Sequence, residues 1–227
     1  PDGIHWNEGP SLQMPQWRDR SLVYGDPGAL CRDDLDPDPS RRYKLVWQAR
    51  VPIDKPDKEE GRAKFLSYGP DIEHMRAADH NPILSPADGF EYEDHHVMLA
   101  PYGGAWAMPY EYAWYLPNGY GVYGTYYGDI RLAVSADGER FTRIDPHQTL
   151  IRRGGNTEWD GGLLVIADKP AIKDGMIHLF YGGNGEEWTS WPSENTPDAY
   201  PFGSTGQIRV SRLGLARPRE DGWTWLE

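Results

Sequence analysis

Residues 135–143 read "SADGERFTR", which places an Asp-Gly turn three residues before an aromatic side chain. Similar segments occur at three other places: "DGIHW" at 2–6, "DIEHM" at 71–75 and "DGWTW" at 221–225. Their aspartates lie 69, 66 and 84 residues apart, and the last interval falls to 68 without the polar, proline-bearing insertion at 186–201. A repeat with a period in the high sixties therefore runs through the whole sequence.

Each period carries the same order of β-strand signals after its turn. The chain has 10 Trp, 14 Tyr, 26 Gly and 20 Pro, a composition that suits many short strands joined by turns. We predict strands at 28–31, 43–49 and 63–68, at 95–100, 110–116, 119–127 and 130–135, and at 163–167, 176–182 and 207–215. Three or four strands per period predict an all-β fold, a β-propeller of four-stranded blades, in one domain over 1–227 with periods that start near 2, 71 and 137.

Composition and charge exclude several classes of protein. The net charge is −12, so the overall field would repel a polyanion, and we expect no nucleic-acid partner. The longest apolar runs are too short to span a bilayer, and no signal peptide opens the sequence, which predicts a soluble protein without a membrane partner. Cys31 is the single cysteine, which excludes an intrachain disulfide and a cysteine-rich zinc site. The sequence starts at Pro1 without a methionine and inside a repeated motif, so a processed or truncated chain is an open alternative to a complete one.

Three aspartates stand at nearly equal distances from the repeated turns. Asp26 lies 24 residues after its turn aspartate, and Asp94 and Asp160 each lie 23 residues after theirs. Equivalent positions at the entry of innermost strands converge on a propeller axis, so we expect these carboxylates to share one pocket, with Glu93 and Glu158 beside them. Crowded carboxylates raise each other's pKa, and glycoside hydrolysis needs one protonated and one ionised acid. The alternative is that each aspartate caps a turn, which aspartate commonly does.

Histidines and tryptophans near these acids are the candidates for binding a sugar. His95 and His96 follow Asp94 directly, and Trp159 lies between the two acids of "TEWDGG" at 157–162. Neighbouring residues of a strand point to opposite faces, so we expect at most one of the two histidines to line the pocket. Structural roles in the core are the alternative for the histidines and for each aromatic residue. The tryptophans that could stack on sugar rings are Trp106, Trp114, Trp159, Trp188 and Trp191.

The motifs together resemble those of a known family. The segments "YGDPG", "DPDPSRRYKLVWQ", "LAVSADGERFTR", "WDGG" and "IHLFYGG" are similar to those of five-bladed β-propeller glycoside hydrolases of the β-fructosidase (invertase) and arabinanase type, with bacterial invertase-like members the most similar. The resemblance implies three acidic residues on inner strands: a nucleophile or base, an aspartate that sets pKa values, and a glutamate acid. Asp26 matches the second of these, except that Gly25 replaces the family's arginine.

The same resemblance implies properties beyond the site. Members are secreted or periplasmic, which is the localisation that the resemblance implies. Related arabinanases hold a cation near the axis through a histidine. A structural cation is therefore an open alternative, and we expect no other cofactor. A five-bladed ring would need roughly 100 more residues at the period found here. We therefore expect a homo-oligomer or a missing segment to complete the propeller.

From these observations we predict a glycoside hydrolase that acts on a carbohydrate substrate. Asp26, Asp94 and Asp160, with Glu93 or Glu158, would divide the acid, base and orienting roles. A non-catalytic propeller that binds a glycan or a protein partner is the first alternative, since propellers host both functions. A glycoside phosphorylase is the second, and its phosphate site would have to involve Arg152 and Arg153.

Overall fold

The computed structural model describes residues 27–56, 58–87, 89–116, 125–145, 148–155, 157–184, 188–189, 211–218 and 223. Over these residues the regular structure consists of β-strands and one short 3-10 helix, η1 (Pro39–Arg41). No helix in this part of the chain has the length and apolar character needed to cross a membrane. The all-β prediction is confirmed.

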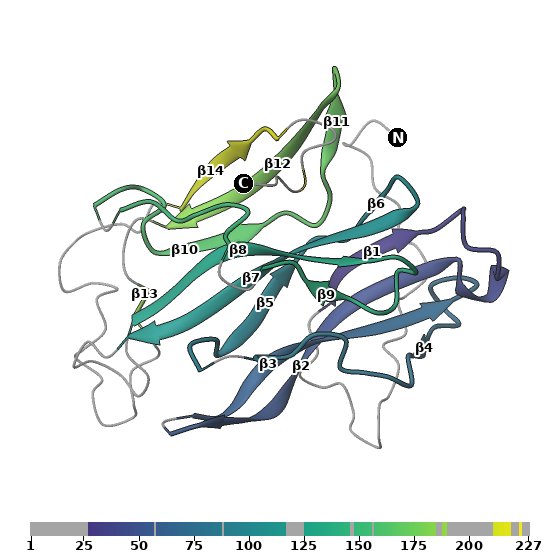
Figure 1. Ribbon diagram of the computed structural model, residues 1–227, viewed down its shortest axis with the longest axis horizontal. Helices are drawn as coiled ribbons and strands as arrows, with labels where there is room; N and C mark the ends of the chain where they lie inside the picture. The colour runs from purple at the N-terminus through teal and green to yellow at the C-terminus, as the bar shows by residue number, and fades with distance from the viewer. Residues whose placement is uncertain are drawn as a thin grey trace.

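The first sheet has four antiparallel strands in the order β1 (Pro27–Arg32), β2 (Tyr43–Lys55), β3 (Lys58–Gly69) and β4 (Arg76–Ala77). Strands β2 and β3 form the long hairpin in the lower part of Figure 1. The strands predicted at 28–31, 43–49 and 63–68 all lie within these elements. Sequential pairing of four strands is the arrangement of a propeller blade.

The second unit repeats this order with β5 (Glu93–Val97), β7 (Ala105–Leu116), β8 (Thr125–Ser135) and β9 (Thr142–Arg143). The prediction of one strand at 95–100 was wrong, because the pairing of β5 with β7 shifts register between Asp94 and Val97, and a separate strand, β6 (Ala100–Tyr102), follows. Such a bulge inserts an extra residue and breaks the alternation of side chains.

The third unit contains β10 (Leu163–Ile166), β12 (Met176–Asn184) and β14 (Ser211–Ala216), with β11 (Ala171–Lys173) paired to β12. A parallel bridge between Leu163 and Gly128 connects it to the second unit, so these units form one curled ten-stranded sheet (Figure 1). The short strand β13 (Trp188–Thr189) pairs with β8. The described part of the chain thus forms three blade-like units.

The repeated aspartates occupy equivalent turns, as predicted. Asp71, between β3 and β4, accepts hydrogen bonds through Oδ1 from the backbone N–H groups of the residues two and three positions later, both at 2.9 Å. Asp137, between β8 and β9, accepts the same two bonds at 2.8 Å. Both turns therefore join the third strand of a unit to the fourth. Asp2 and Asp221 lie outside the described residues.

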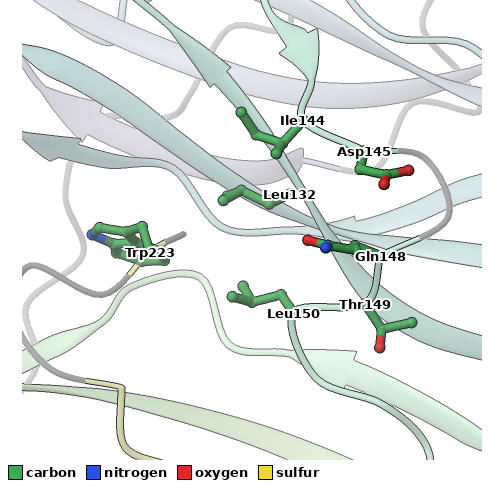
Figure 2. A pocket seen from close by; sticks show the side chains of 7 residues that line it. All are labelled: Leu132, Ile144, Asp145, Gln148, Thr149, Leu150 and Trp223. Atoms are coloured by element: carbon green, nitrogen blue, oxygen red, sulfur yellow. The ribbon is translucent and has the colours of Figure 1, made fainter. Parts of the chain in front are cut away.

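Apolar side chains fill the spaces between neighbouring units. One cluster joins the first and second units through Val46, Leu66, Met108 and Tyr110, and another joins the second and third through Met98, Ile130, Leu164 and Ile177. The second cluster borders a cavity of about 20 Å³, where Leu132, Leu150 and Trp223 lie around the space seen in Figure 2. That volume holds about one water molecule and is too small for a sugar.

Candidate functional site

An open hollow of about 550 Å³ lies where the second unit meets the loop that leads into β10. Trp114 of β7 and Asp129 and Arg131 of β8 line it from the sheet, and Arg152, Arg153 and Glu158 line it from the loop, with Phe90 at its edge. Small-molecule sites have volumes of about 300–1,000 Å³ and combine apolar walls with a few placed polar groups. The hollow has the size of such a site, and its lining is more charged, with five charged and two aromatic side chains.

The alternation of side chains along β7 and β8 explains why these residues meet. Asp129 and Arg131 are two residues apart in β8 and point to the same face, as do Tyr112 and Trp114 in β7. Arg131 donates from Nε to Asp129 Oδ1 at 3.1 Å, and its Cζ lies 3.3 Å from the centroid of the Tyr112 ring. The ion pair and the ring together hold the guanidinium flat against the sheet.

The loop before β10 brings two carboxylates together. Gly154 donates its backbone N–H to the carbonyl of Asp160 at 3.1 Å, and Gly155 donates its own to Glu158 Oε2 at 2.8 Å. A Cβ added to Gly154 would collide with both Glu158 Oε2 and Asp160 Oδ1. The two oxygens therefore lie within about 5 Å of each other, which brings the two carboxyl groups into one place.

Trp159 lies between these acids in sequence but packs onto the third unit. Its ring stacks on Tyr181 of β12 with centroids 5.7 Å apart and an angle of 21°. Tyr181 donates its hydroxyl hydrogen to Asp160 Oδ2 at 3.2 Å, and Gly183 leaves the space that the indole fills. Trp159 thus fixes the position of Asp160, and Phe90 and Trp114 form the aromatic wall of the hollow.

Glu93 and Asp94 of β5 are fully buried in ion-pair networks and do not line the hollow. Glu93 pairs with Lys58 and Arg62 and accepts a hydrogen bond from Tyr115 at 3.1 Å. Burial raises the pKa of Glu93, but the opposite effect of the two cations is larger, so the pKa lies below its usual value. Asp94 lies 3.4 Å from Arg143 Nη2, and burial, with Glu91 nearby, raises its pKa well above the usual value.

Asp26 lies outside the described residues, so the shared pocket of Asp26, Asp94 and Asp160 stays a prediction. The structure brings Asp160 together with Glu158, and Asp94 together with Glu93 and Arg143. Asp94 lies within β5, whereas Asp160 lies in the turn that precedes β10. The equal sequence offsets therefore do not place these two acids at the same point of their strands.

His95 and His96 both lie near Glu111, and neither lines the hollow, so the prediction that at most one of them lines the sugar pocket stays a prediction. The bulge in β5 removes the alternation, and the two rings lie 4.1 Å apart between centroids. His95 Nδ1 is 3.9 Å from Glu111 Oε1, and His96 Nε2 is 3.8 Å from Oε2. Burial, then the adjacent His96, lowers the pKa of His95, so its imidazole is neutral. Burial raises the pKa of Glu111 to about 7.

This trio has the donor atoms that a divalent transition metal prefers. The three ligand atoms all lie within 4.8 Å of one another, and His95 Nδ1 is buried without a hydrogen-bond partner among the described residues. Zinc binds imidazole nitrogen at 2.0–2.1 Å, so the side chains would have to close by about 1 Å around an ion. The residues fit such an ion in chemistry, while the nearby cations Arg62 and Lys64 weaken its binding.

Of the other predicted tryptophans, Trp106 does not line this hollow, and the side chains of Trp188 and Trp191 lie outside the described part of the chain. Trp106 is buried and borders a different hollow of about 540 Å³ together with Asp36 and Asp137, and Lys44 Nζ lies 5.4 Å from its ring. Trp188 belongs to β13, whose backbone pairs with β8, and its side chain lies outside the described part. Trp191 is not among the described residues, so its role in binding stays a prediction.

Sequence reasoning missed three residues of the hollow. Asp129, Arg131 and Phe90 were not among the predicted site residues, although two opposite charges at alternate positions of an otherwise apolar strand, "GDIRLAV", were a usable signal. Charged groups on the buried part of a strand are rare unless paired or functional.

The fold and the hollow define a class before any relative is considered: an all-β protein of blade-like units, as in a β-propeller, with a polar hollow between two units. The sequence matches no protein-family model, and the search of curated proteins gives no match. Similar solved structures exist. One is Zg3597, a family 117 glycoside hydrolase of the marine bacterium Zobellia galactanivorans, with 14% identity over 88% of this chain and 53% of that chain and a TM-score of 0.57.

Two further structures are similar over shorter portions. The GH32 β-fructofuranosidase BmSUC1 of Bombyx mori has 14% identity over 78% of this chain and 31% of that chain, with a TM-score of 0.48. A complex of BT0996 with RGII has 18% identity over 65% and 39%, also with a TM-score of 0.48. The chain thus spans between about a third and a half of the length of these structures. The match to Zg3597 supports the propeller-like fold and leaves the activity to be argued from the site.

Proposed function

We propose that this protein is a glycosidase-type enzyme that cleaves a glycosidic bond in the hollow lined by Trp114, Arg131 and Glu158. The observation that carries the proposal is the pair of carboxylates, Glu158 and Asp160, on either side of Gly154. Hydrolysis of a glycoside needs one carboxylic acid to protonate the leaving oxygen and a second carboxylate to act as nucleophile or base. Glu158 lines the hollow, and Asp160, which is not among the lining residues, places an oxygen next to Glu158 at Gly154, itself a lining residue.

The two acids have different surroundings, as their roles require. Glu158 is exposed at the rim and accepts a backbone hydrogen bond through Oε2. Asp160 is half-buried beside the rings of Trp159 and Tyr181 and accepts a hydrogen bond from the Tyr181 hydroxyl. We propose that these two share the acid and base or nucleophile roles. Glu93 and Asp94 would support the site from β5, because ion pairs hold both of them, and Asp26 is kept as a third acid.

A non-catalytic glycan-binding module is the second candidate. Its supporting observation is that Glu158 bonds to the backbone of its own loop, as a turn cap would, while Phe90 and Trp114 form an aromatic wall. Such a module would bind a sugar without cleaving it. The two candidates therefore give different expectations. The glycosidase forms product and needs the carboxylates of Glu158 and Asp160 for catalysis, whereas the binding module forms no product.

We also propose that His95, His96 and Glu111 hold a divalent cation with a structural role. Glu111 is on β7 and the histidines are on β5, so an ion bound there would tie the two strands together at the bulge. The ion is separate from the proposed chemistry, because none of its three ligands lines the hollow.

The test is a hydrolysis screen of the 227-residue chain against plant and algal oligosaccharides, with products read by mass spectrometry. Glu158→Gln and Asp160→Asn keep the side-chain shapes and remove the ionisable groups, so each should lower kcat by about 10²- to 10⁴-fold with an unchanged melting temperature. Glu73→Gln, an exposed carboxylate near the Asp71 turn, is the matched control and should retain full activity. Binding of an oligosaccharide without product formation, unaffected by either substitution, would replace this proposal with the binding module.

A further inference from the structure

The hollow carries a cluster of cations that the hydrolysis of a neutral sugar does not need. Arg131, Arg152 and Arg153 line it, against the carboxylates of Asp129 and Glu158. The lining is therefore net positive in a chain whose net charge is −12. A local excess of cations attracts anionic ligands to the hollow, whereas the acidic remainder of the surface repels them.

The three arginines line the same hollow and all act electrostatically on one carboxylate, that of Asp129. Burial raises the pKa of Asp129, while Arg131, then Arg153 and then Arg152 act on its carboxylate in the opposite direction. All three arginines therefore lie close enough to Asp129 for their charges to be felt there. They come from two segments, β8 and the loop before β10, so this arrangement arises only in the folded protein.

One nitrogen of the Arg131 guanidinium, the buried Nη1, has no hydrogen-bond partner among the described residues. The Arg131 side chain is 10% exposed, and Nε is bonded to Asp129. A guanidinium has five N–H donors in a planar fork that matches a carboxylate. Buried polar atoms without a partner are rare in native proteins, and each one calls for an explanation, such as a functional role or a bound water or ion.

The neighbouring groups keep the cluster in place and open to a ligand. Arg153 donates to the carbonyl of Gly161, and its Cζ lies 4.7 Å from the ring centroid of Tyr127 and 5.9 Å from that of Trp114. Arg152 is exposed and forms no ion pair within the described part of the chain. Arg153 is thus held by rings and a carbonyl, and Arg152 is an exposed residue of the lining.

An aromatic wall stands beside the cations. Phe90 is 52% exposed, which is unusual for so large an apolar side chain, and its ring centroid lies 5.4 Å from that of Trp114. Aromatic faces suit the apolar C–H faces of sugar rings, while a free inorganic anion would gain nothing from them. The combination of wall and cations is the complement of a sugar ring that bears an acidic group.

We propose that Arg131, Arg152 and Arg153 form an oxyanion site that binds the carboxylate of a uronic acid residue, with the sugar ring against Phe90. This inference deepens the proposed glycosidase function, since it assigns an acidic glycan to the same hollow. Arg131 would bind the carboxylate through its planar fork, and the exposed Arg152 would add charge.

Calorimetric binding of three probes to the 227-residue chain tests the assignment: tetragalacturonate, the neutral galactotetraose, and inorganic phosphate. We expect tetragalacturonate to bind at least about tenfold more tightly than galactotetraose, with a preference that shrinks as salt rises from about 0.05 to 0.5 M. Arg152→Gln should lower the acidic-to-neutral affinity ratio about fivefold. Arg32→Gln removes an exposed arginine that pairs with Asp34 in the first unit, and it should leave the ratio unchanged.

Arg131→Lys provides a second variant that keeps the charge next to Asp129 and loses the fork. Arg131→Lys should also lower the acidic-to-neutral affinity ratio. The melting temperature of this variant shows whether it is folded. Equal affinity for the acidic and neutral probes, with no effect of Arg152→Gln, overturns the inference. A second result also overturns the inference: phosphate binds at the arginines, and tetragalacturonate binds no more tightly than galactotetraose. That result would favour a phosphorylase.

The outcomes also separate this inference from the proposed function. An acidic probe that binds through the arginines and is never cleaved supports the oxyanion site and contradicts the glycosidase proposal. A neutral oligosaccharide that is cleaved with no preference for acidic sugars does the reverse.

Discussion

Glu158 Oε2 and Asp160 Oδ1 both lie against the α-carbon of Gly154, at the place that a Cβ would need. The carboxylates are two residues apart, and the hydrogen bond from the Gly154 N–H to the Asp160 carbonyl closes the loop that brings them together. A glycine at this position is therefore a condition for the acid pair.

Replacing Gly154 by alanine should separate the two acids. The backbone of Gly154 is not in the left-handed region, so alanine is allowed there, and its methyl group would push away two side-chain ends rather than backbone. We expect kcat to fall by about 10- to 100-fold, because catalytic groups tolerate little displacement, with a nearly unchanged melting temperature.

Gly155→Ala is the matched control, since the nearest atoms of Glu158 lie 4.0 Å from the position that the new methyl group would take, an ordinary contact. It should retain most of the activity. Equal activity of the two variants would show that the spacing of the acids across Gly154 does not matter for the reaction.

The packing of Trp159 should be sensitive to Gly183. A Cβ at Gly183 would lie 2.7 Å from the Trp159 ring and 2.8 Å from the Asp160 Cβ, so alanine must displace both residues. We expect Gly183→Ala to lower the free energy of unfolding by about 1–3 kcal/mol and to lower activity too, as Asp160 shifts. Gly182→Ala has only a contact of 3.9 Å and should be close to the unsubstituted protein in urea unfolding. Equal midpoints for both variants would contradict the proposed packing role.

Asp137 should stabilise the fold in a pH-dependent way. Burial raises the pKa of Asp137, but hydrogen bonds from the N–H groups of Arg140 and Glu139 and from the Ser135 hydroxyl lower it by more, so the pKa is about 2. The folded-state pKa lies below the unfolded one, so the stabilisation is present above pH ~4 and is lost as pH falls toward about 2.

Urea unfolding of Asp137→Asn measures this contribution. Because the side chain is largely exposed, solvent screening limits the expected loss to about 1 kcal/mol near neutral pH, and the difference from the unsubstituted protein should vanish near pH ~2. Asp71→Asn should change in the same direction, since His74, the Asp71 hydrogen-bond partner, heads the groups that lower the pKa of that carboxyl. A difference that stays constant from acid to neutral pH would mean that the turn does not depend on the charge.

Zinc should stabilise the protein through His95, His96 and Glu111. A ligand that binds only the folded state raises the melting temperature in proportion to the logarithm of its concentration. We expect Zn²⁺ to raise it by several degrees and a chelator to reverse the shift.

The double variant His95→Ala, His96→Ala should lose this response, whereas His74→Ala, an exposed histidine of the Asp71 turn, should keep it. The same shift in the double variant and in the unsubstituted protein would place the metal elsewhere.

Much of the fold follows from local signals in the sequence. The Asp71 and Asp137 turns depend on hydrogen bonds that span three residues, and the strands around Val46 and Leu179 depend on apolar runs bounded by turns. Such features need no distant partner, which explains why the repeat and the all-β class could be predicted.

The site depended on information that no short segment contains. Glu158 and Asp160 were predicted from their position, but their pairing at Gly154 requires the closed loop. The stacking of Trp159 on Tyr181 of β12 likewise joins two segments that are apart in the sequence. The bulge in β5 turned both histidines toward Glu111, which a two-residue period cannot anticipate.

The sequence by itself determined the repeated turns, the strand order and the acidic overall charge, because each of these is a property of neighbouring residues or of composition. Only the tertiary structure decided that Arg131 of β8, Arg152 of the loop and Phe90 line one hollow. It also decided that Asp94 forms an ion pair with Arg143. The physical reason is that burial and charge pairing depend on which segments pack together, and these contacts join residues that are far apart in the sequence.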